Sequence, residues 1–340
     1  MSRRAVFRGP RRMTIEETSE PSPAVDELVL KVESCGICGT DRAIFRGDVP
    51  LEPPIVLGHE YSGTIVAIGS QVRFPETGER VCVDPNVTCG ACVYCRRGFS
   101  HLCQRLSPLG ISRHGGFAEY SAVPAGYAYS LPDTLTLEAG ALIEPLACAI
   151  RGLEQASVEP GDTVTILGAG AIGCLLLQLS RVSGAAATIV AEPDAARRER
   201  SAAFGADIVC DSGDEARAVV MEQTEGVGAD VVIEASGTTD GARLALDLVR
   251  RGGRVVWFGV YPESQLIEVS PYLINENEIT IRGSFNNPFT HQAAVALAAS
   301  GRLRLSELVS DTITLSRLSM ALDPAAPLPA GKVLVQPSTG

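Results

Sequence analysis

Residues 166–173 read Ile-Leu-Gly-Ala-Gly-Ala-Ile-Gly, and this stretch decides the fold of half the chain. It follows an apolar run predicted to be a buried strand, and it opens an apolar segment, residues 171–183, predicted to be a helix. In such a turn Gly168 permits the tight bend, Gly170 lets a pyrophosphate approach the backbone, and Gly173 lets the helix pack on the strand. N–H groups at the helix start then face the phosphates. The residues predicted to bind a dinucleotide here are Gly168, Gly170, Ala171, Ile172 and Gly173.

From about residue 148, apolar runs typical of buried strands alternate with segments typical of helices. This alternation predicts a parallel sheet with helices on both faces, the doubly wound Rossmann arrangement, over residues 148–285. The strand candidates are residues 163–167, 188–191, 207–210, 230–234 and 254–258.

The second of these strands ends at Glu192, 19 residues after Gly173. A carboxylate there accepts hydrogen bonds from both ribose hydroxyls and repels a 2′-phosphate, which favours NAD over NADP. The other interpretation of Glu192 is a solvent-facing residue at a strand end. Arg197 is predicted to lie over the adenine or, alternatively, at the surface. Its neighbour Arg198 is a cation that could pair with a 2′-phosphate, so NADP stays an alternative cofactor.

Before residue 148 the pattern is different. Short β-rich runs at 28–32 and 61–66 are separated by turns rich in Gly and Pro, which predicts a barrel-like, mainly antiparallel domain. A final strand candidate at 331–336 returns to it. We expect this domain to comprise residues 1–147 and 286–340.

The chain carries 29 basic and 40 acidic residues, a formal net charge of −11. This balance argues against affinity for nucleic acid or an anionic membrane surface. No apolar run approaches the roughly 20 residues of a membrane span, and the basic N-terminus lacks the apolar stretch of a signal peptide. We therefore expect a cytoplasmic protein with reduced thiols.

Four of the ten cysteines fall within fifteen residues, in a segment at 84–105. Two disulfides, a redox centre and a bound metal all explain such a cluster. Reduced thiols disfavour disulfides, and the spacing CxxCxxCx7C supplies four soft ligands for a closed tetrahedral zinc site. His101 is the local competitor and is expected to be a bystander. The ligands predicted by the spacing are Cys89, Cys92, Cys95 and Cys103.

A nicotinamide cofactor accepts hydride but does not deprotonate an alcohol, so the first domain needs a group that stabilises an alkoxide. Cys38, His59 and Glu60 offer a thiolate, an imidazole and a carboxylate, which hold zinc and leave a position open. Each of them alone is equally a core residue. Because neighbours on a regular strand point to opposite faces, His59 and Glu60 both bind only if the backbone bends near Gly58.

Five motifs, in this order over nearly the whole chain, resemble the zinc-containing medium-chain dehydrogenases and specifically their polyol (sorbitol-type) branch. The resemblance implies a GroES-like catalytic barrel joined to a Rossmann domain. The motifs are Gly-Ile-Cys-Gly-Thr-Asp (36–41), Gly-His-Glu (58–60), Cys-Gly-Ala-Cys (89–92), Ile-Glu-Pro-Leu-Ala-Cys (143–148) and Gly-Ala-Gly-Ala-Ile-Gly (168–173).

The resemblance implies two zinc ions per chain, one catalytic and one structural. It assigns the catalytic ion to Cys38, His59 and Glu60, with Glu144 binding directly or through water. The four clustered cysteines become the structural site, with no part in turnover. Asp41 is expected to orient His59 by hydrogen bonding.

The resemblance also makes Thr40 the first proton carrier. Relatives pass the proton on through a His or Tyr a few residues later, where this chain has Ala43 and Ile44. The relay is then expected to use ordered water, a cofactor hydroxyl or Glu144.

Sorbitol-type relatives carry an Arg and a Tyr after the last Rossmann strand, where residues 283–288 here read Gly-Ser-Phe-Asn-Asn-Pro. Two amides favour a neutral or amino-substituted polyol, cyclitol or sugar; alternatively the Asn pair only forms a turn. The residues expected to contact substrate are Phe45, Phe117, Phe285, Asn286 and Asn287.

The predicted function is therefore NAD-dependent oxidation of a secondary hydroxyl to a ketone by a homodimer or homotetramer. Threonine dehydrogenases share almost all these motifs and are one alternative. A zinc-binding interaction protein with a vestigial nucleotide fold is the alternative from another class.

Overall fold

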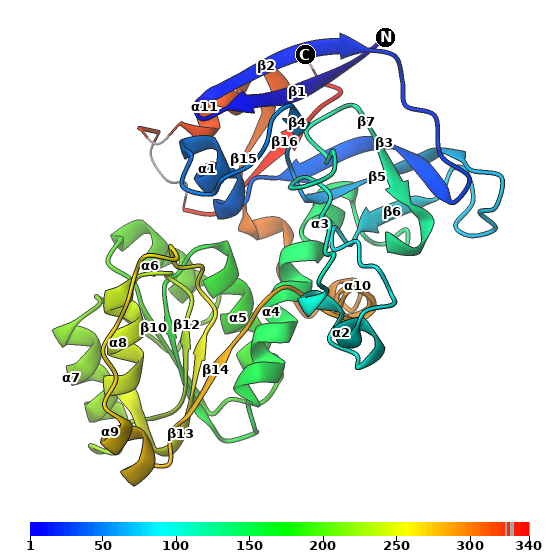
Figure 1. Ribbon diagram of the computed structural model, residues 1–340. Helices are drawn as coiled ribbons and strands as arrows, with labels where there is room; N and C mark the ends of the chain where they lie inside the picture. Colours follow the sequence, from blue (N-terminus) through cyan, green and yellow to red (C-terminus); the bar gives the residue numbers. More distant parts are fainter. Residues whose placement is uncertain (324, 327–329, 340) are drawn as a thin grey trace. The chain divides into compact units, whose positions relative to one another are not determined.

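The computed structural model describes residues 1–323, 325–326 and 330–339, and the chain divides into two compact units (Figure 1). The first unit comprises 1–147, 287–301 and 305–340, and the second comprises 148–286 and 302–304. Asn286 and residues 302–304 thus belong to the second unit, which differs from the expected boundaries. Arg304 is held there because its backbone N–H donates to Gln178 Oε1 at 2.8 Å and its guanidinium lies over the Phe204 ring.

The first unit is built on a mainly antiparallel sheet of seven strands, ordered β15-β16-β3-β5-β6-β8 with β7 also paired to β3. The C-terminal strand β16 pairs with β3, so the chain returns to the first unit as expected. The strands are β3 (Glu27–Gly36), β5 (Glu60–Ile68), β6 (Arg80–Val83), β7 (Tyr120–Pro124), β8 (Ala128–Ser130), β15 (Val309–Thr314) and β16 (Lys332–Gln336).

A smaller sheet and several short helices complete the first unit. The sheet has the order β2-β1-β4, and its strands are β1 (Ser2–Gly9), β2 (Arg12–Thr18) and β4 (Ile55–Val56). The α-helices are α1 (Gly39–Arg46), α2 (Val93–Arg96), α3 (Leu137–Ala141), α10 (His291–Ala299) and α11 (Leu318–Leu322), and α4 (Ile143–Ala156) runs across the boundary between the units. The 3₁₀ turns are Ser100–Leu102, Ala125–Tyr127, Ser306–Leu308 and Leu315–Arg317.

The second unit is a six-stranded parallel sheet with the order β11-β10-β9-β12-β13-β14, the doubly wound arrangement. In Figure 1, α5 lies on one side of this sheet and α7 and α8 lie on the other. The strands are β9 (Thr163–Leu167), β10 (Ala187–Ala191), β11 (Ile208–Cys210), β12 (Ala229–Glu234), β13 (Val249–Trp257) and β14 (Thr280–Gly283). The helices are α5 (Ala171–Val182), α6 (Ala195–Ala203), α7 (Asp214–Gln223), α8 (Thr239–Leu248) and α9 (Pro271–Glu276).

All five strands expected from the apolar runs are present, and the fold class is confirmed. The edge strand β14 was not among them, because its side chains are half-buried or exposed and give no apolar run. Within the described residues, no helix is both long and apolar enough to cross a bilayer.

Candidate metal and cofactor sites

Donor atoms of Cys38, His59 and Glu60 meet in the first unit, all within 4.8 Å of one another. Cys38 lies between the end of β3 and the start of α1, and Glu60 is the first residue of β5. Strands β3 and β5 pair in antiparallel register with Gly36 opposite Glu60. This pairing brings the two sequence motifs together.

Two glycines make room for this arrangement. Gly58 has φ +90°, and a Cβ there would lie 2.7 Å from Cys35 Sγ, so a side chain is excluded. The backbone therefore bends just before β5, which lets His59 and Glu60 both face the cluster, as the sequence required. At Gly36, a Cβ would lie 2.2 Å from Glu60 Oε2, so this glycine gives the carboxylate its place.

Asp41 ties the two ligand-bearing segments together and is fully buried. Its Oδ2 accepts a hydrogen bond from the Cys38 backbone N–H at 2.8 Å, and its Oδ1 accepts from the Gly58 N–H at 3.3 Å. The same Oδ1 lies 3.6 Å from His59 Nδ1. This distance is longer than a hydrogen bond, and His59 Nδ1 is buried without a hydrogen-bond partner among the described residues, so the expected bond to Asp41 is not formed. Because Nδ1 faces Asp41, Nε2 of His59 is left for a metal.

Metal binding at this cluster is expected to release a proton and to strengthen as the pH rises from about 6 to about 8. In the metal-free protein, burial opposes a charge on His59, but Asp41 and Cys38 outweigh it and raise the pKa of His59 well above its ordinary value. Zinc has to displace that proton. Calorimetric titration of metal-free protein in buffers of different ionisation enthalpy measures the release, and a proton count of zero throughout would contradict this geometry.

Lys332 is a member of this cluster that the sequence did not reveal. It is the first residue of β16, and its Nζ donates to Glu60 Oε1 and Oε2 at 2.7 Å each and to the Ile37 carbonyl at 3.2 Å. Burial disfavours its charge, but Glu60 and Cys38 raise the pKa of Lys332 above its ordinary value. The sequence signal for it was a lysine directly before the apolar run Val-Leu-Val at 333–335.

Glu144 lies in the first turn of α4 and is 8% exposed, but it is not part of the group within 4.8 Å. Its Oε1 accepts a hydrogen bond from Asn287 Nδ2 at 2.9 Å. Asn287 is 1% exposed and also accepts from Asn86 Nδ2 at 2.7 Å. The structure therefore gives Asn287 protein partners on both sides, and its direct contact with substrate stays a prediction.

Two of the residues expected to contact substrate are buried instead. Phe45 and Phe117 belong to the hydrophobic core of the barrel, with exposed fractions of 2% and 0%. They present no surface to a ligand. Phe285, by contrast, is exposed, and Asn286 has a positive φ of 52°; both lie in the second unit.

The four clustered cysteines form a second candidate metal group within 4.8 Å. Cys92 Sγ lies 3.5 Å from Cys95 Sγ and 4.0 Å from Cys103 Sγ. A tetrahedral zinc with Zn–S bonds of about 2.3 Å requires sulfur atoms about 3.8 Å apart, so the spacing fits. All ten cysteines are free thiols, which excludes the disulfide alternative for this structure.

Backbone N–H groups also point at these sulfur atoms. The Cys89 N–H donates to Cys103 Sγ at 3.3 Å, and the Cys92 N–H donates to Cys89 Sγ at 3.4 Å. Backbone donors from Ala91 and Cys92 lower the pKa of Cys89 to about 5, whereas desolvation raises the pKa of Cys95 to about 11. The Cys89 thiolate therefore forms readily, and its negative charge disfavours ionisation of the neighbouring thiols. A divalent cation bound between the sulfur atoms offsets this repulsion.

The glycine-rich turn of the second unit has the backbone geometry that the sequence predicts. Gly168 has φ +99°, and a Cβ on Gly173 would lie 2.0 Å from the Gly168 carbonyl oxygen. Gly170 has no atom within 4 Å of its Cβ position, so space is open where a pyrophosphate would approach the backbone. Ala171 and Ile172 open α5 immediately after it.

Glu192 follows β10 and points back at this turn. Its Oε2 accepts from the Ala169 N–H at 2.7 Å, and its Oε1 accepts from the Asp194 N–H at 3.0 Å. It is 4% exposed, so the interpretation as a solvent-facing residue is wrong. Arg197 lies in the first turn of α6, and the Arg198 guanidinium donates to the Glu192 carbonyl at 2.6 Å.

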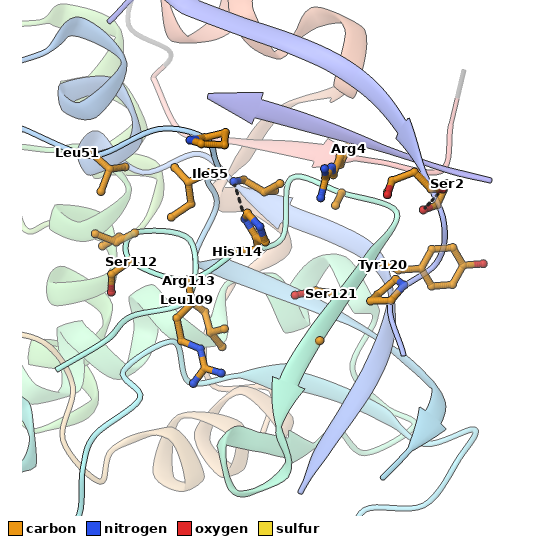
Figure 2. Close-up of a pocket in the computed structure, with 18 of the residues that line it drawn as sticks. Ser2, Arg4, Leu51, Ile55, Leu109, Ser112, Arg113, His114, Tyr120 and Ser121 are labelled. Carbon is orange, nitrogen blue, oxygen red and sulfur yellow. Dashed lines mark hydrogen bonds between the residues drawn. The ribbon is translucent and has the colours of Figure 1, made fainter. Parts of the chain in front are cut away.

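The first unit also contains an outer cavity of about 950 Å³. Figure 2 shows it lined by Arg4, Leu51, His114 and Tyr120 among others. The Val56 backbone N–H donates to His114 Nδ1 at 3.2 Å. None of the expected site residues lines this cavity.

Comparison with known proteins gives a consistent assignment. Two family models match: the alcohol dehydrogenase GroES-like domain over residues 24–133 and the zinc-binding dehydrogenase over residues 171–300. D-arabinitol dehydrogenase 1 of Uromyces fabae is 34% identical over 338 residues, covering 98% of this chain and 96% of that protein. Sorbitol dehydrogenase of Bacillus subtilis strain 168 is 32% identical over 327 residues, covering 94% and 92%.

A solved structure agrees along the full length. It is a protein from Sinorhizobium meliloti 1021 described as a zinc-binding dehydrogenase and bound to NADP, with a TM-score of 0.94, 38% identity and 99% of each chain covered. The expected resemblance is confirmed. The chain belongs to the zinc-containing medium-chain dehydrogenases and, within them, to the polyol dehydrogenase branch.

Proposed function

We propose that this protein oxidises a secondary hydroxyl of a polyol, cyclitol or sugar to a ketone, with NAD as the hydride acceptor and zinc at Cys38, His59 and Glu60. The observation that carries the proposal is the convergence of these three donor atoms within 4.8 Å of one another. Glu144 is proposed as the fourth partner of the ion, directly or through water. The homologous polyol dehydrogenases support the reaction class.

Zinc held there supplies a Lewis acid that lowers the pKa of a bound hydroxyl toward neutrality. The chain's own residues then hold the donor atoms and handle the proton. Asp41 lies against His59 Nδ1, and Lys332 holds Glu60 by two hydrogen bonds. Thr40 takes the proton first: its Oγ1 lies 3.7 Å from Cys38 Sγ in the first turn of α1.

Positions 43 and 44, where relatives carry a His or Tyr that passes the proton on, are Ala and Ile in this chain and have no titratable group. We propose that the proton leaves through water, a cofactor hydroxyl or Glu144. The four-cysteine group holds the second zinc and leaves no position open for substrate. We further propose a cytoplasmic homodimer or homotetramer.

NAD is proposed as the cofactor on the basis of Glu192. Its buried carboxylate lies against the glycine-rich turn, where a ribose would be bound and where a 2′-phosphate would meet its negative charge. Arg198, the neighbouring cation, is already hydrogen bonded to the Glu192 and Pro193 carbonyls. The NADP bound to the Sinorhizobium protein makes this preference a point for direct measurement.

Glu192→Ala is expected to lower the ratio of kcat/KM for NAD over NADP by about 10-fold or more, because it removes about 1.4 kcal/mol or more of discrimination. The ratio comes from initial rates with each cofactor at saturating substrate. Glu215→Ala, in the first turn of α7, is the control and keeps the wild-type ratio. An unchanged ratio in Glu192→Ala would remove Glu192 from cofactor selection.

The substrate class is tested by NAD reduction over linear polyols, cyclitols, aminocyclitols, sugars and threonine. We expect turnover with at least one neutral or amino-substituted polyhydroxy compound and weak turnover with phosphorylated ones, because the chain carries a net charge of −11. Turnover with threonine alone would contradict the proposed substrate class. Absence of turnover with every compound, in protein loaded with two zinc ions, would contradict the enzyme assignment.

A further inference from the structure

We propose that Asn287 is a positioning residue for the Glu144 carboxylate and that Asn86 and Asp84 hold Asn287 in place. The proposal rests on the proposed function, because Glu144 matters only if it serves the zinc site. All four residues lie in the first unit. The segment that carries Asn287 is more than 140 residues from Glu144 in the sequence.

A continuous series of side-chain hydrogen bonds joins these residues. Asn287 Nδ2 donates to Glu144 Oε1 at 2.9 Å, and Asn86 Nδ2 donates to Asn287 Oδ1 at 2.7 Å. Asp84 Oδ1 accepts from both the backbone N–H and the Nδ2 of Asn86, at 3.0 Å each. The side-chain amides of Asn287 and Asn86 are therefore each hydrogen bonded to two neighbours, one toward Glu144 and one toward Asp84.

The direction of these bonds is fixed by the two carboxylates. An ionised carboxylate only accepts hydrogen bonds, so Glu144 requires the NH₂ group of Asn287, whose oxygen then requires the NH₂ group of Asn86. Asp84 anchors the other end in the same way. Side-chain amides do not readily pass protons, so the series orients Glu144 and provides no proton path.

The backbone around Asn287 is also constrained. Asn286 and Phe289, on either side of it, have φ of 52° and 62°, which is unusual for residues other than glycine and marked for a bulky Phe. Thr290 Oγ1 donates to the Ala147 carbonyl at 2.8 Å, which fastens the turn to α4, the helix that carries Glu144. Strained backbone of this kind persists where the surroundings hold it, and it concentrates at functional sites.

A cavity of about 260 Å³ lies beside the series, with Asp84, Asn86 and Asn287 among its lining residues. The second carboxylate oxygen of Asp84, Oδ2, lies 3.6 Å from His291 Nδ1. His291 is fully buried and stacked on Tyr129. Because the amides border a cavity on one side, substitutions there have room to be accommodated.

The test compares Asn287→Asp and Asn86→Ser with wild type and with Ser121→Ala. Asn287→Asp keeps the side-chain size, removes the donor to Glu144 and places a second carboxylate there. Asn86→Ser removes the donor that orients Asn287. Ser121→Ala removes another buried hydrogen bond of the same unit, to Tyr61 Oη at 3.2 Å, without touching this series.

Three readouts separate positioning from structure: zinc affinity of the Cys38 site, the visible spectrum of the cobalt-substituted protein, and the pH profile of kcat. Asn287→Asp is expected to lose about 10–100-fold in zinc affinity or kcat, with a changed cobalt spectrum, and Asn86→Ser to lose less in the same direction. Ser121→Ala is expected to change thermal stability alone.

Wild-type values of all three readouts in Asn287→Asp would overturn the proposal, and so would equal losses in Ser121→Ala. This failure differs from failure of the proposed function, which would show as wild-type protein that does not oxidise any polyhydroxy compound. Zinc affinity and the cobalt spectrum are measured without substrate, so they report on Asn287 in either case.

Discussion

His59→Ala is expected to lower kcat/KM by about 10³-fold or more, because losing metal-assisted stabilisation of the alkoxide removes about 4 kcal/mol or more from the transition state. The imidazole supplies one of three donor atoms that lie within 4.8 Å of one another, and its Nδ1 faces Asp41, which leaves Nε2 for the ion. Cys38→Ser is expected to have a similar effect. Initial rates of NAD reduction with the best substrate of the panel measure the loss.

His114→Ala is the matched control for His59→Ala. His114 lies in the same unit but lines the outer cavity of Figure 2, away from the expected site residues. Its loss removes one hydrogen bond, from the Val56 backbone N–H, and turnover should stay within about 3-fold of wild type, less than 1 kcal/mol in the barrier. Wild-type turnover in His59→Ala would contradict catalysis by a zinc ion at this site.

Lys332→Ala is expected to lower the free energy of unfolding of the metal-free protein by about 3–5 kcal/mol, because it leaves the buried Glu60 carboxylate without its cation. Glu60 is 2% exposed and accepts from Lys332 Nζ through both oxygens. Zinc bound beside Glu60 supplies a second positive charge, so the loss should be smaller in the zinc-loaded protein. Denaturant unfolding with and without zinc measures both values.

Lys31, the only other lysine in the chain, provides the control. Its side chain is exposed on β3, and Lys31→Ala should change stability by no more than about 0.5 kcal/mol. Equal effects of the two substitutions would show that the ion pair with Glu60 adds nothing to the barrel. An effect of Lys332→Ala that does not depend on zinc would separate Lys332 from the metal site.

Local patterns predicted much of the fold. Gly173 is explained by a contact within a few residues, because a Cβ there would lie 2.0 Å from the Gly168 carbonyl oxygen. The bend at Gly58 followed from the requirement that two adjacent side chains face one metal. The metal site of the cysteine cluster was equally predictable from the sequence, because its ligands lie within fifteen residues and their spacing alone indicates a tetrahedral site.

Long-range partners were beyond such patterns. Lys332 reaches Glu60 only because β16 returns to pair with β3, and no local signal couples positions 272 residues apart. Asn287 was expected either to contact substrate or to form a turn, yet a buried carboxylate and a second amide take up its hydrogen bonds. Phe117 was placed in the pocket by its nearness to a motif, whereas packing against the bend at Gly58 puts it in the core.

The central claim is that the sparse set of Cys38, His59 and Glu60 holds a second zinc ion, separate from the one in the cysteine cluster. Metal analysis of the purified protein tests it most directly. Wild type should contain two zinc ions per chain, and the double variant Cys38→Ser/His59→Ala should retain one while keeping the wild-type circular dichroism spectrum. One zinc ion in wild type, or an unchanged content in the double variant, would contradict the account.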